Sequence, residues 1–245
     1  MTVLVIGGSG ETRQLAQGLS SCGIAAVLTL SKPMSGLSTE GADCYIGRFD
    51  SLTDFEQFAQ DRNVRAILDA GHPFAAGVSV CAARFARQTG RGYLRLLRPA
   101  WRAGRHDRWT EIDTPAEALS TIPQGARVFV GTGRGSLSDL EGLDRGRTVF
   151  VRVRDAEADL PGLPGARALT ELPPFTVARE CALLRELRID WMVVRNAGGD
   201  GAWPKLEAAR TIGISVAMLR RPEMPGPQVS TVEEAVQWAR QYRSG

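Results

Sequence analysis

The amino-acid sequence predicts an α/β protein of two domains, each built on a parallel β-sheet. Short buried apolar runs alternate with segments of helical pattern along the whole chain, and this order is typical of parallel sheets. Two of the runs end in glycine-rich turns, at residues 7–10 and 131–135. Each half also has a late strand ending in Arg-Pro, at Arg98 and Arg221, and a later Thr-x-x-Glu helix start.

The composition is that of a soluble globular protein. The chain has 245 residues, enough for one large domain or two small ones, with 43% hydrophobic and 23% charged residues. We find no apolar run of membrane-spanning length and no secretory leader, so we expect a cytoplasmic protein. The four cysteines form no C-x-x-C pair, and with two histidines they offer no metal-ligand spacing.

The basic residues are almost all arginine. Only Lys32 and Lys205 are lysines among 30 basic residues, and codon bias in a GC-rich genome explains most of this excess. A substrate with many carboxylates is the functional explanation, because a guanidinium binds a carboxylate through two hydrogen bonds. Nucleic acid is disfavoured as a partner, because 27 acidic residues are interspersed and no basic run occurs.

The N-terminal residues predict a phosphate site. Residues 2–6 have the composition of a buried strand, glycines follow at residues 7–10, and residues 11–21 have a helical pattern. A helix that starts at such a turn presents unpaired N–H groups and a positive dipole end to an anion. The match to the dinucleotide-binding fingerprint is incomplete, because Arg13 occupies the third glycine position. A glycine turn that binds nothing is the alternative.

The end of the second strand favours NADP over NAD. Residues 24–30 form an apolar run that continues into Ser31 and Lys32, with no carboxylate before Glu40. NAD-preferring sites carry Asp or Glu near this point to bind the ribose 2′-hydroxyl. A hydroxyl and an ammonium instead suit a 2′-phosphate.

The rest of the first half continues the alternation. We expect strands at 42–46, 64–68, 92–97 and 109–112 and helices after Asp50 and at 75–87. His72 follows the strand at 64–68, at the sheet edge where α/β proteins bind ligands, and could donate a proton near neutral pH. A loop histidine bonded to nearby backbone is the equal alternative. Arg98 and Trp101 fit either a substrate groove or a domain hinge.

The second half, residues 113–245, repeats the pattern. Thr114 is the expected cap of its first helix. Residues 127–130 lead into a glycine turn with Arg134, a second candidate anion site, which a helix should follow. We expect strands at 148–153, 191–194 and 215–219, the last of the chain, helices at 175–187, 204–212 and 231–242, and a mobile loop at 159–174.

Taken together, the motifs resemble those of the precorrin-6A reductase family of cobalamin biosynthesis. The resemblance runs almost the full length, in the same order. The residues that carry it are Gly7-Gly8-Ser9-Gly10-Glu11, Asp69-Ala70-Gly71-His72-Pro73-Phe74-Ala75, Arg98-Pro99-x-Trp101, Gly131-Thr132-Gly133-Arg134, Asn196-Ala197-Gly198-Gly199 and Lys205-Leu206-x-Ala208-Ala209-Arg210.

The resemblance implies hydride transfer from NADPH to a ring carbon of a polycarboxylate tetrapyrrole, giving precorrin-6B. It implies two Rossmann-like domains with the active site in the cleft between them, residues 1–112 binding NADP and residues 113–245 contributing to the substrate cleft. It leaves open a cobalt-containing substrate and transient contact with neighbouring pathway enzymes. The protein then mainly positions the two reactants, so we expect no metal site and no strong nucleophile.

The candidate site residues divide into three groups. For the cofactor they are Gly8, Ser9, Gly10, Thr12, Arg13, Ser31, Lys32, Gly131 and Thr132. For the substrate they are Arg98, Trp101, Arg134, Arg195, Asn196, Gly198, Gly199 and Lys205. His72 is the candidate proton donor.

Four other functions compete with this interpretation. A short-chain dehydrogenase is excluded in its usual form, because no tyrosine is followed four residues later by lysine. The residues alone also permit another NADP-dependent reductase of a polyanion, a non-catalytic NADP-sensing module, or a nucleotide-sugar transferase.

Overall fold

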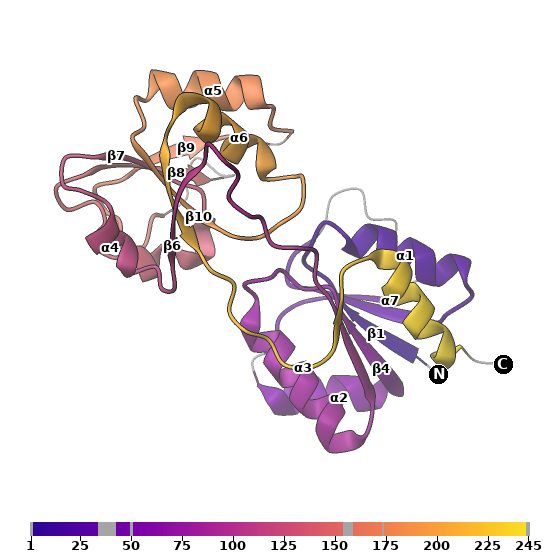
Figure 1. Cartoon of the computed structure of the whole chain (residues 1–245). Helices are drawn as coiled ribbons and strands as arrows, with labels where there is room; N and C mark the ends of the chain where they lie inside the picture. Colours follow the sequence, from indigo (N-terminus) through magenta and orange to yellow (C-terminus); the bar gives the residue numbers. More distant parts are fainter. Residues whose placement is uncertain (1, 34–42, 50, 154–158, 173, 244–245) are drawn as a thin grey trace. The chain divides into compact units, whose positions relative to one another are not determined.

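The computed structural model describes residues 2–33, 43–49, 51–153, 159–172 and 174–243. The predicted positions Ala42 and Asp50 lie outside these residues, as does most of the loop after Pro33. The chain forms two compact units (Figure 1). The first unit contains Met1–Pro99 and Pro222–Gly245, and the second contains Ala100–Arg221.

A six-stranded parallel sheet forms the centre of the first unit, with strand order β12-β5-β4-β1-β2-β3. The strands are β1 (Thr2–Ile6), β2 (Ala26–Leu30), β3 (Asp43–Ile46), β4 (Val64–Asp69), β5 (Gly92–Leu96) and β12 (Gln228–Val229). The direction of progression along the sheet reverses between β1 and β4. In open parallel sheets, ligands bind at this switch point, beyond the carboxyl ends of the strands.

Helices cover both faces of this sheet (Figure 1). On one face α1 (Thr12–Ser21) packs against α7 (Val232–Ala239), which the short helix η3 (Arg240–Tyr242) continues. On the other face lie α2 (Leu52–Asp61) and α3 (Ala76–Thr89). Side chains alternate between the faces along a strand, so Val3 and Val5 join the α1–α7 core whereas Leu4 and Ile6 join the α2–α3 core.

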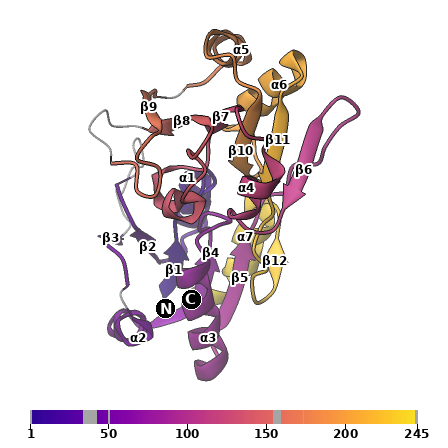
Figure 2. The same cartoon turned by 90° about the vertical axis from the view of Figure 1, so that its left-hand side faces the viewer.

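The second unit also has a six-stranded parallel sheet, with strand order β6-β11-β10-β7-β8-β9 (Figure 2). Its strands are β6 (Arg108–Ile112), β7 (Arg127–Val130), β8 (Thr148–Val153), β9 (Arg167–Thr170), β10 (Trp191–Arg195) and β11 (Ser215–Leu219). Its helices are α4 (Glu117–Thr121), η1 (Arg134–Ser136), η2 (Ser138–Leu140), α5 (Val177–Glu186) and α6 (Trp203–Ile212). The helices α5 and α6 pack together over one face.

The two sheets have the same topology. Each unit receives its last edge strand and the helix after it from a segment of the chain that follows a crossing between the units. After Arg98-Pro99 the chain enters the second unit and adds the edge strand β6 and then α4. After Arg221-Pro222 it returns and adds the edge strand β12 and then α7. The two Arg-Pro motifs noted in the sequence are therefore the two crossings between the units.

This exchange changes the division that the sequence predicted at residues 112 and 113. The strand β6 pairs with β11 in the second sheet, and β12 pairs with β5 in the first. A contiguous boundary therefore assigns β6 to the wrong sheet and separates α7 from α1. Since β12 has only two residues, periodicity does not detect it, and β11 is not the last strand.

Three local predictions also need correction. Part of the predicted loop at 159–174 is the edge strand β9, whose mostly exposed residues lack an apolar run. The turn after β7 continues into the 3₁₀ helices η1 and η2 rather than an α-helix. Thr114 does not cap α4, because its hydroxyl donates to Glu117 Oε1 at 2.9 Å and the N-cap residue is Ala116. No helix among the described residues combines the length and apolar content of a membrane span.

Candidate functional site

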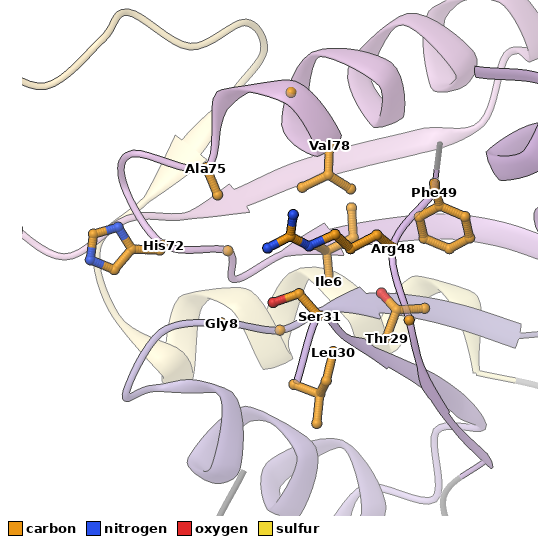
Figure 3. Close-up of a pocket in the computed structure, with 14 residues that line it drawn as sticks. Ile6, Gly8, Thr29, Leu30, Ser31, Arg48, Phe49, His72, Ala75 and Val78 are labelled. Atoms are coloured by element: carbon orange, nitrogen blue, oxygen red, sulfur yellow. The ribbon is translucent and has the colours of Figure 1, made fainter. Parts of the chain in front are cut away.

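A cavity of about 430 Å³ opens at the switch point of the first sheet (Figure 3). Its walls are the segments that follow β1, β2, β3 and β4, together with the start of α3. None of the described residues that line it carries a carboxylate. The cavity therefore has the position and the charge that suit an anionic nucleotide.

The glycine turn after β1 forms the floor of this cavity. Gly8 has a φ of +146°, and a Cβ there would lie 3.3 Å from the backbone nitrogen of His72. A Cβ on Gly7 would meet the Leu30 side chain at 2.5 Å. The Ser9 N–H donates to the carbonyl of Ala70 at 3.1 Å, which fastens the turn to the segment after β4. Glycine is therefore needed where the two turns meet.

The start of α1 is held by side chains of the same turn. Thr12 is buried, and its Oγ1 accepts a hydrogen bond from the Gly8 N–H at 3.1 Å. Glu11 is the N-cap residue but makes no side-chain cap, and its carboxylate instead pairs with Arg98 at 2.6 Å. Ser9 is buried, Arg13 is exposed, and the space beside Gly10 is open.

Glu11 stays ionised in this setting. Burial raises the pKa of Glu11, but a backbone hydrogen bond and the charge of its partner Arg98 outweigh it, so the pKa is lowered. Arg98, predicted to bind substrate carboxylates, is thus already paired within the first unit beside the glycine turn.

Ser31 and Lys32 were the candidates for the end of the cavity next to β2, and the structure separates them. Ser31 lines the cavity after β2, whereas Lys32 is exposed and does not line it. Arg48, after β3, does line it, and its side chain extends across the space (Figure 3). Arg48 was not among the predicted site residues. The sequence shows only that Arg48 follows a predicted strand, and the pairing of that strand with β2 comes from the structure.

His72 lies at the edge of the cavity, half-buried (Figure 3). Its Nδ1 accepts a hydrogen bond from the Phe74 N–H at 3.2 Å. In the neutral ring the single proton is then on Nε2. A histidine that transfers a proton is the imidazolium, in which Nδ1 also carries hydrogen, so His72 has to give up its contact with the Phe74 N–H to act as a proton donor.

A buried ion pair supports the loop that carries His72. Asp69 and Arg95 face each other on β4 and β5 and are 0% and 1% exposed, with Arg95 Nη1 2.6 Å from Asp69 Oδ2. Asp69 also accepts hydrogen bonds from the Gly71 N–H and the Tyr93 hydroxyl at 2.9 and 2.8 Å. Arg95 donates to Ser79 on α3 and to the carbonyl of His72. The pair thus ties two strands, one helix and the His72 loop together.

The Tyr93 hydroxyl acts as a donor in this network. Burial raises the pKa of Tyr93, and the charge of Asp69 raises it further. Tyr93 therefore stays protonated at every physiological pH. In the sequence, the only sign of this ion pair is that Asp69 and Arg95 occur in two otherwise apolar strand segments.

The second unit gathers cationic side chains around its own glycine turn. A Cβ on Gly131 would lie 3.5 Å from Lys205 Cε, and one on Gly133 would lie 3.4 Å from Arg195 Nη2. Thr132 is buried, and its Oγ1 has no hydrogen-bond partner in the described part of the chain. We call Thr132, Arg195 and Lys205 the second-unit cluster.

Burial lowers the pKa of both cationic side chains of this cluster. Burial, together with the charges of Arg152 and Arg195 and against the opposing charge of Glu180, lowers the pKa of Lys205 to about 8. Burial also lowers the pKa of Arg195, while Asp139 raises it. Arg152 itself is compensated by ion pairs with Glu180 and Glu171, both at 2.7 Å. A bound anion would stabilise the charged form of Lys205, which burial disfavours.

The remaining substrate candidates fall into two sets. Trp101 and Asn196 bind each other, since Asn196 Oδ1 accepts from the Trp101 N–H at 2.8 Å and Asn196 Nδ2 donates to the Trp101 carbonyl at 2.9 Å. The Trp101 indole donates to the Gly199 carbonyl at 3.0 Å, and Gly198 and Gly199 have positive φ. These contacts fix the loop after β10. Arg134 is exposed at the start of η1.

Comparison with known proteins identifies the family. The model of the family described as precorrin-6x reductase CbiJ/CobK matches residues 2–240. The chain belongs to this family. Precorrin-6A reductase of Rhodobacter capsulatus is 34% identical over 96% of this chain and 94% of its own length. The precorrin-6A reductase of Rhodococcus erythropolis is 35% identical, with 96% of both chains covered.

A solved family structure has the same fold. The structure of CobK precorrin-6A reductase matches with a TM-score of 0.88 and 33% identity, over 99% of this chain and 97% of that one. Relatives named cobalt-precorrin-6A reductases also match, at 25–30% identity. The two Rossmann-like domains expected from the sequence are therefore confirmed. As a separate observation, the described part of the chain contains no group of three or more His, Cys, Asp or Glu side chains that could hold a metal ion.

The buried ion pair predicts a specific pattern of stability. Arg95→Met leaves the Asp69 carboxylate buried without its cation, and we expect it to lower the free energy of unfolding by roughly 3–5 kcal/mol. Asp69→Leu/Arg95→Met removes both charges and should cost less than Arg95→Met alone. Urea denaturation measures both values. Arg62→Met, which breaks the more exposed pair with Asp43, is the control and should cost less than about 1 kcal/mol. A double variant less stable than Arg95→Met would contradict this account.

Proposed function

We propose that this protein reduces precorrin-6A to precorrin-6B with NADPH, in cobalamin biosynthesis. The observation that carries the proposal is a cavity at the switch point whose described lining residues carry no carboxylate, in a chain that the family model matches from residue 2 to residue 240. The relatives named precorrin-6A reductases support the substrate, because they cover 96% of this chain at 33–35% identity.

The residues of the first cavity fit NADP. The pyrophosphate would lie at the glycine turn, against Gly8, Ser9, Gly10, Thr12 and Arg13. The close approach that Gly8 permits and the N-terminus of α1 are the features that suit a phosphate there. Ser31 and Lys32 follow β2, where the ribose 2′-position is bound in this type of sheet. When bound, the cofactor supplies a hydride.

Reduction of the ring also requires a proton, and His72 is our candidate donor. The acid would be the imidazolium, which transfers the Nε2 proton and becomes neutral imidazole, and the Nδ1 contact with the Phe74 N–H can form only in the neutral ring. A histidine titrates near neutral pH, so it can release and regain a proton in each turnover.

The second-unit cluster is our candidate site for a substrate carboxylate. Arg195 and Lys205 supply charge, and the unpartnered hydroxyl of Thr132 supplies a hydrogen-bond donor. Gly131 and Thr132, first assigned to the cofactor, are therefore assigned here to the substrate. Arg134 is exposed beside this cluster and can meet a further carboxylate. Arg98 is a weaker candidate, because Glu11 already pairs with it.

The metal-free substrate is favoured over its cobalt-containing analogue. Relatives named for the cobalt form are 25–30% identical to this chain, against 33–35% for those named for the metal-free form. A non-catalytic NADP-sensing module would bind the nucleotide without turnover.

A steady-state assay tests the proposed function. We expect the purified protein to oxidise NADPH when precorrin-6A is added, and to do so far more slowly with NADH. Cobalt-precorrin-6A is the comparison substrate and should give a lower kcat/KM. Tight NADPH binding without turnover on either macrocycle would instead indicate the sensing module.

Removal of the candidate proton donor should slow the reaction. His72→Ala should lower kcat by about a hundredfold, with little change in the KM for NADPH, because general acid catalysis contributes on this scale. Stopped-flow or steady-state absorbance of NADPH measures the effect. His106→Ala, the other histidine of the chain, is the control. Normal turnover of His72→Ala across the pH range would remove His72 from the mechanism.

The lowered pKa of Lys205 predicts a pH dependence. The ammonium is charged below pH 8 and neutral above it, so kcat/KM for precorrin-6A should fall as the pH rises through about 8. Loss of one charge-assisted hydrogen bond corresponds to roughly tenfold or more. Lys205→Arg keeps its charge and should flatten the profile. An unchanged fall in Lys205→Arg would assign the titration to another group.

A further inference from the structure

Arg48 is a cation inside the nucleotide cavity that the proposed function does not use. It follows β3 by two residues, and its side chain crosses the cavity so that the guanidinium lies between Ser31 and Val78 (Figure 3). The structure gives Arg48 no ion pair or hydrogen bond with any described residue. None of the described residues that line the cavity carries a carboxylate, so this guanidinium is suited to an anionic ligand.

The backbone on either side of Arg48 is held in place. The Gly47 N–H donates to the carbonyl of Leu30 at 2.9 Å, which ties the end of β3 to the end of β2. A Cβ on Gly47 would lie within 2.8 Å of the Tyr45 ring, so the position requires glycine. Phe49 is anchored by aromatic contacts to Tyr45, Phe55 and Phe58, with ring centroids 5.7, 5.1 and 5.2 Å apart. Arg48 is therefore presented from a fixed segment, as binding groups in preorganised sites are.

The position of Arg48 matches one part of NADP better than the others. The pyrophosphate is assigned to the glycine turn and the N-terminus of α1, at the other end of the floor. The ribose 2′-position belongs near the end of β2, where Ser31 lines the same cavity as Arg48 (Figure 3). A planar guanidinium binds a phosphate through two hydrogen bonds, which a lysine does not.

We propose that Arg48, with the Ser31 hydroxyl, forms the 2′-phosphate site and sets the preference for NADPH over NADH. This inference rests on the proposed function, since it assumes that the cavity binds a nicotinamide nucleotide. Lys32 and Arg48 are both exposed, but only Arg48 lines the cavity, so the proposal moves the main cationic contact from Lys32 to the residue that follows β3 by two positions.

Binding without turnover tests the proposal. Calorimetry with 2′,5′-ADP and 5′-AMP, and with NADP⁺ and NAD⁺, isolates the 2′-phosphate from the rest of the nucleotide. We expect Arg48→Gln to weaken NADP⁺ and 2′,5′-ADP by roughly ten- to a hundredfold and to change NAD⁺ and 5′-AMP less than twofold. Arg65→Gln is the matched control, because Arg65 is exposed at the opposite end of β4 from the cavity. Lys32→Gln should have a smaller effect on NADP⁺ than Arg48→Gln.

Several outcomes would overturn the proposal. An equal loss for NADP⁺ and NAD⁺ in Arg48→Gln would assign the guanidinium to the adenine or the pyrophosphate. A selective loss in Lys32→Gln with none in Arg48→Gln would return the 2′-phosphate to Lys32. If the unaltered protein binds no nucleotide, the proposed function fails as well. If it prefers NADP⁺ and Arg48→Gln keeps that preference, only the present inference fails.

Discussion

The ion pair between Asp69 and Arg95 is the interaction on which the first unit's site depends. It lies in the layer between the sheet and α3, where two unpaired charges would each cost several kcal/mol. The pair also bonds to the Gly71 N–H and the His72 carbonyl, so its geometry fixes the loop against which the glycine turn packs. Shape at the switch point is thus set by a buried polar network, while the apolar residues on both sides provide most of the stability.

The repeated topology explains how one chain could carry the two different anion sites that we propose. Each sheet has a glycine turn after its first central strand, at Gly8 and at Thr132, but the two turns lead into different structures. In the first unit an α-helix begins there, and its N-terminus attracts a phosphate. In the second unit the turn continues into two 3₁₀ helices, and the side chains of Arg195 and Lys205 provide the charge instead. A helix dipole suits a nucleotide phosphate, and cationic side chains suit a carboxylate at the rim of a large ring.

The sequence predicted most strands and helices of both sheets because buried parallel strands are apolar runs and because several helices have side-chain N-caps, at Ser51, Thr176 and Thr231. The prediction failed where the structure depends on which strands pair with each other. Neither the short strand β12 nor the assignment of β6 can be read from local periodicity. The site was predicted in part for the same reason. The glycine turn and Ser31 follow strands directly, whereas the role of Arg48 depends on which strand neighbours β2, and the Asp69–Arg95 pair depends on the register of β4 and β5.

The central claim is that hydride passes from NADPH to precorrin-6A on this protein. Incubation with NADPH carrying deuterium at both C4 positions of the nicotinamide, followed by mass spectrometry of the macrocycle, tests it directly. We expect precorrin-6B with one deuterium on a ring carbon, formed in a one-to-one ratio with NADP⁺. Precorrin-6B without deuterium, or NADPH consumed without reduction of the macrocycle, would contradict the claim.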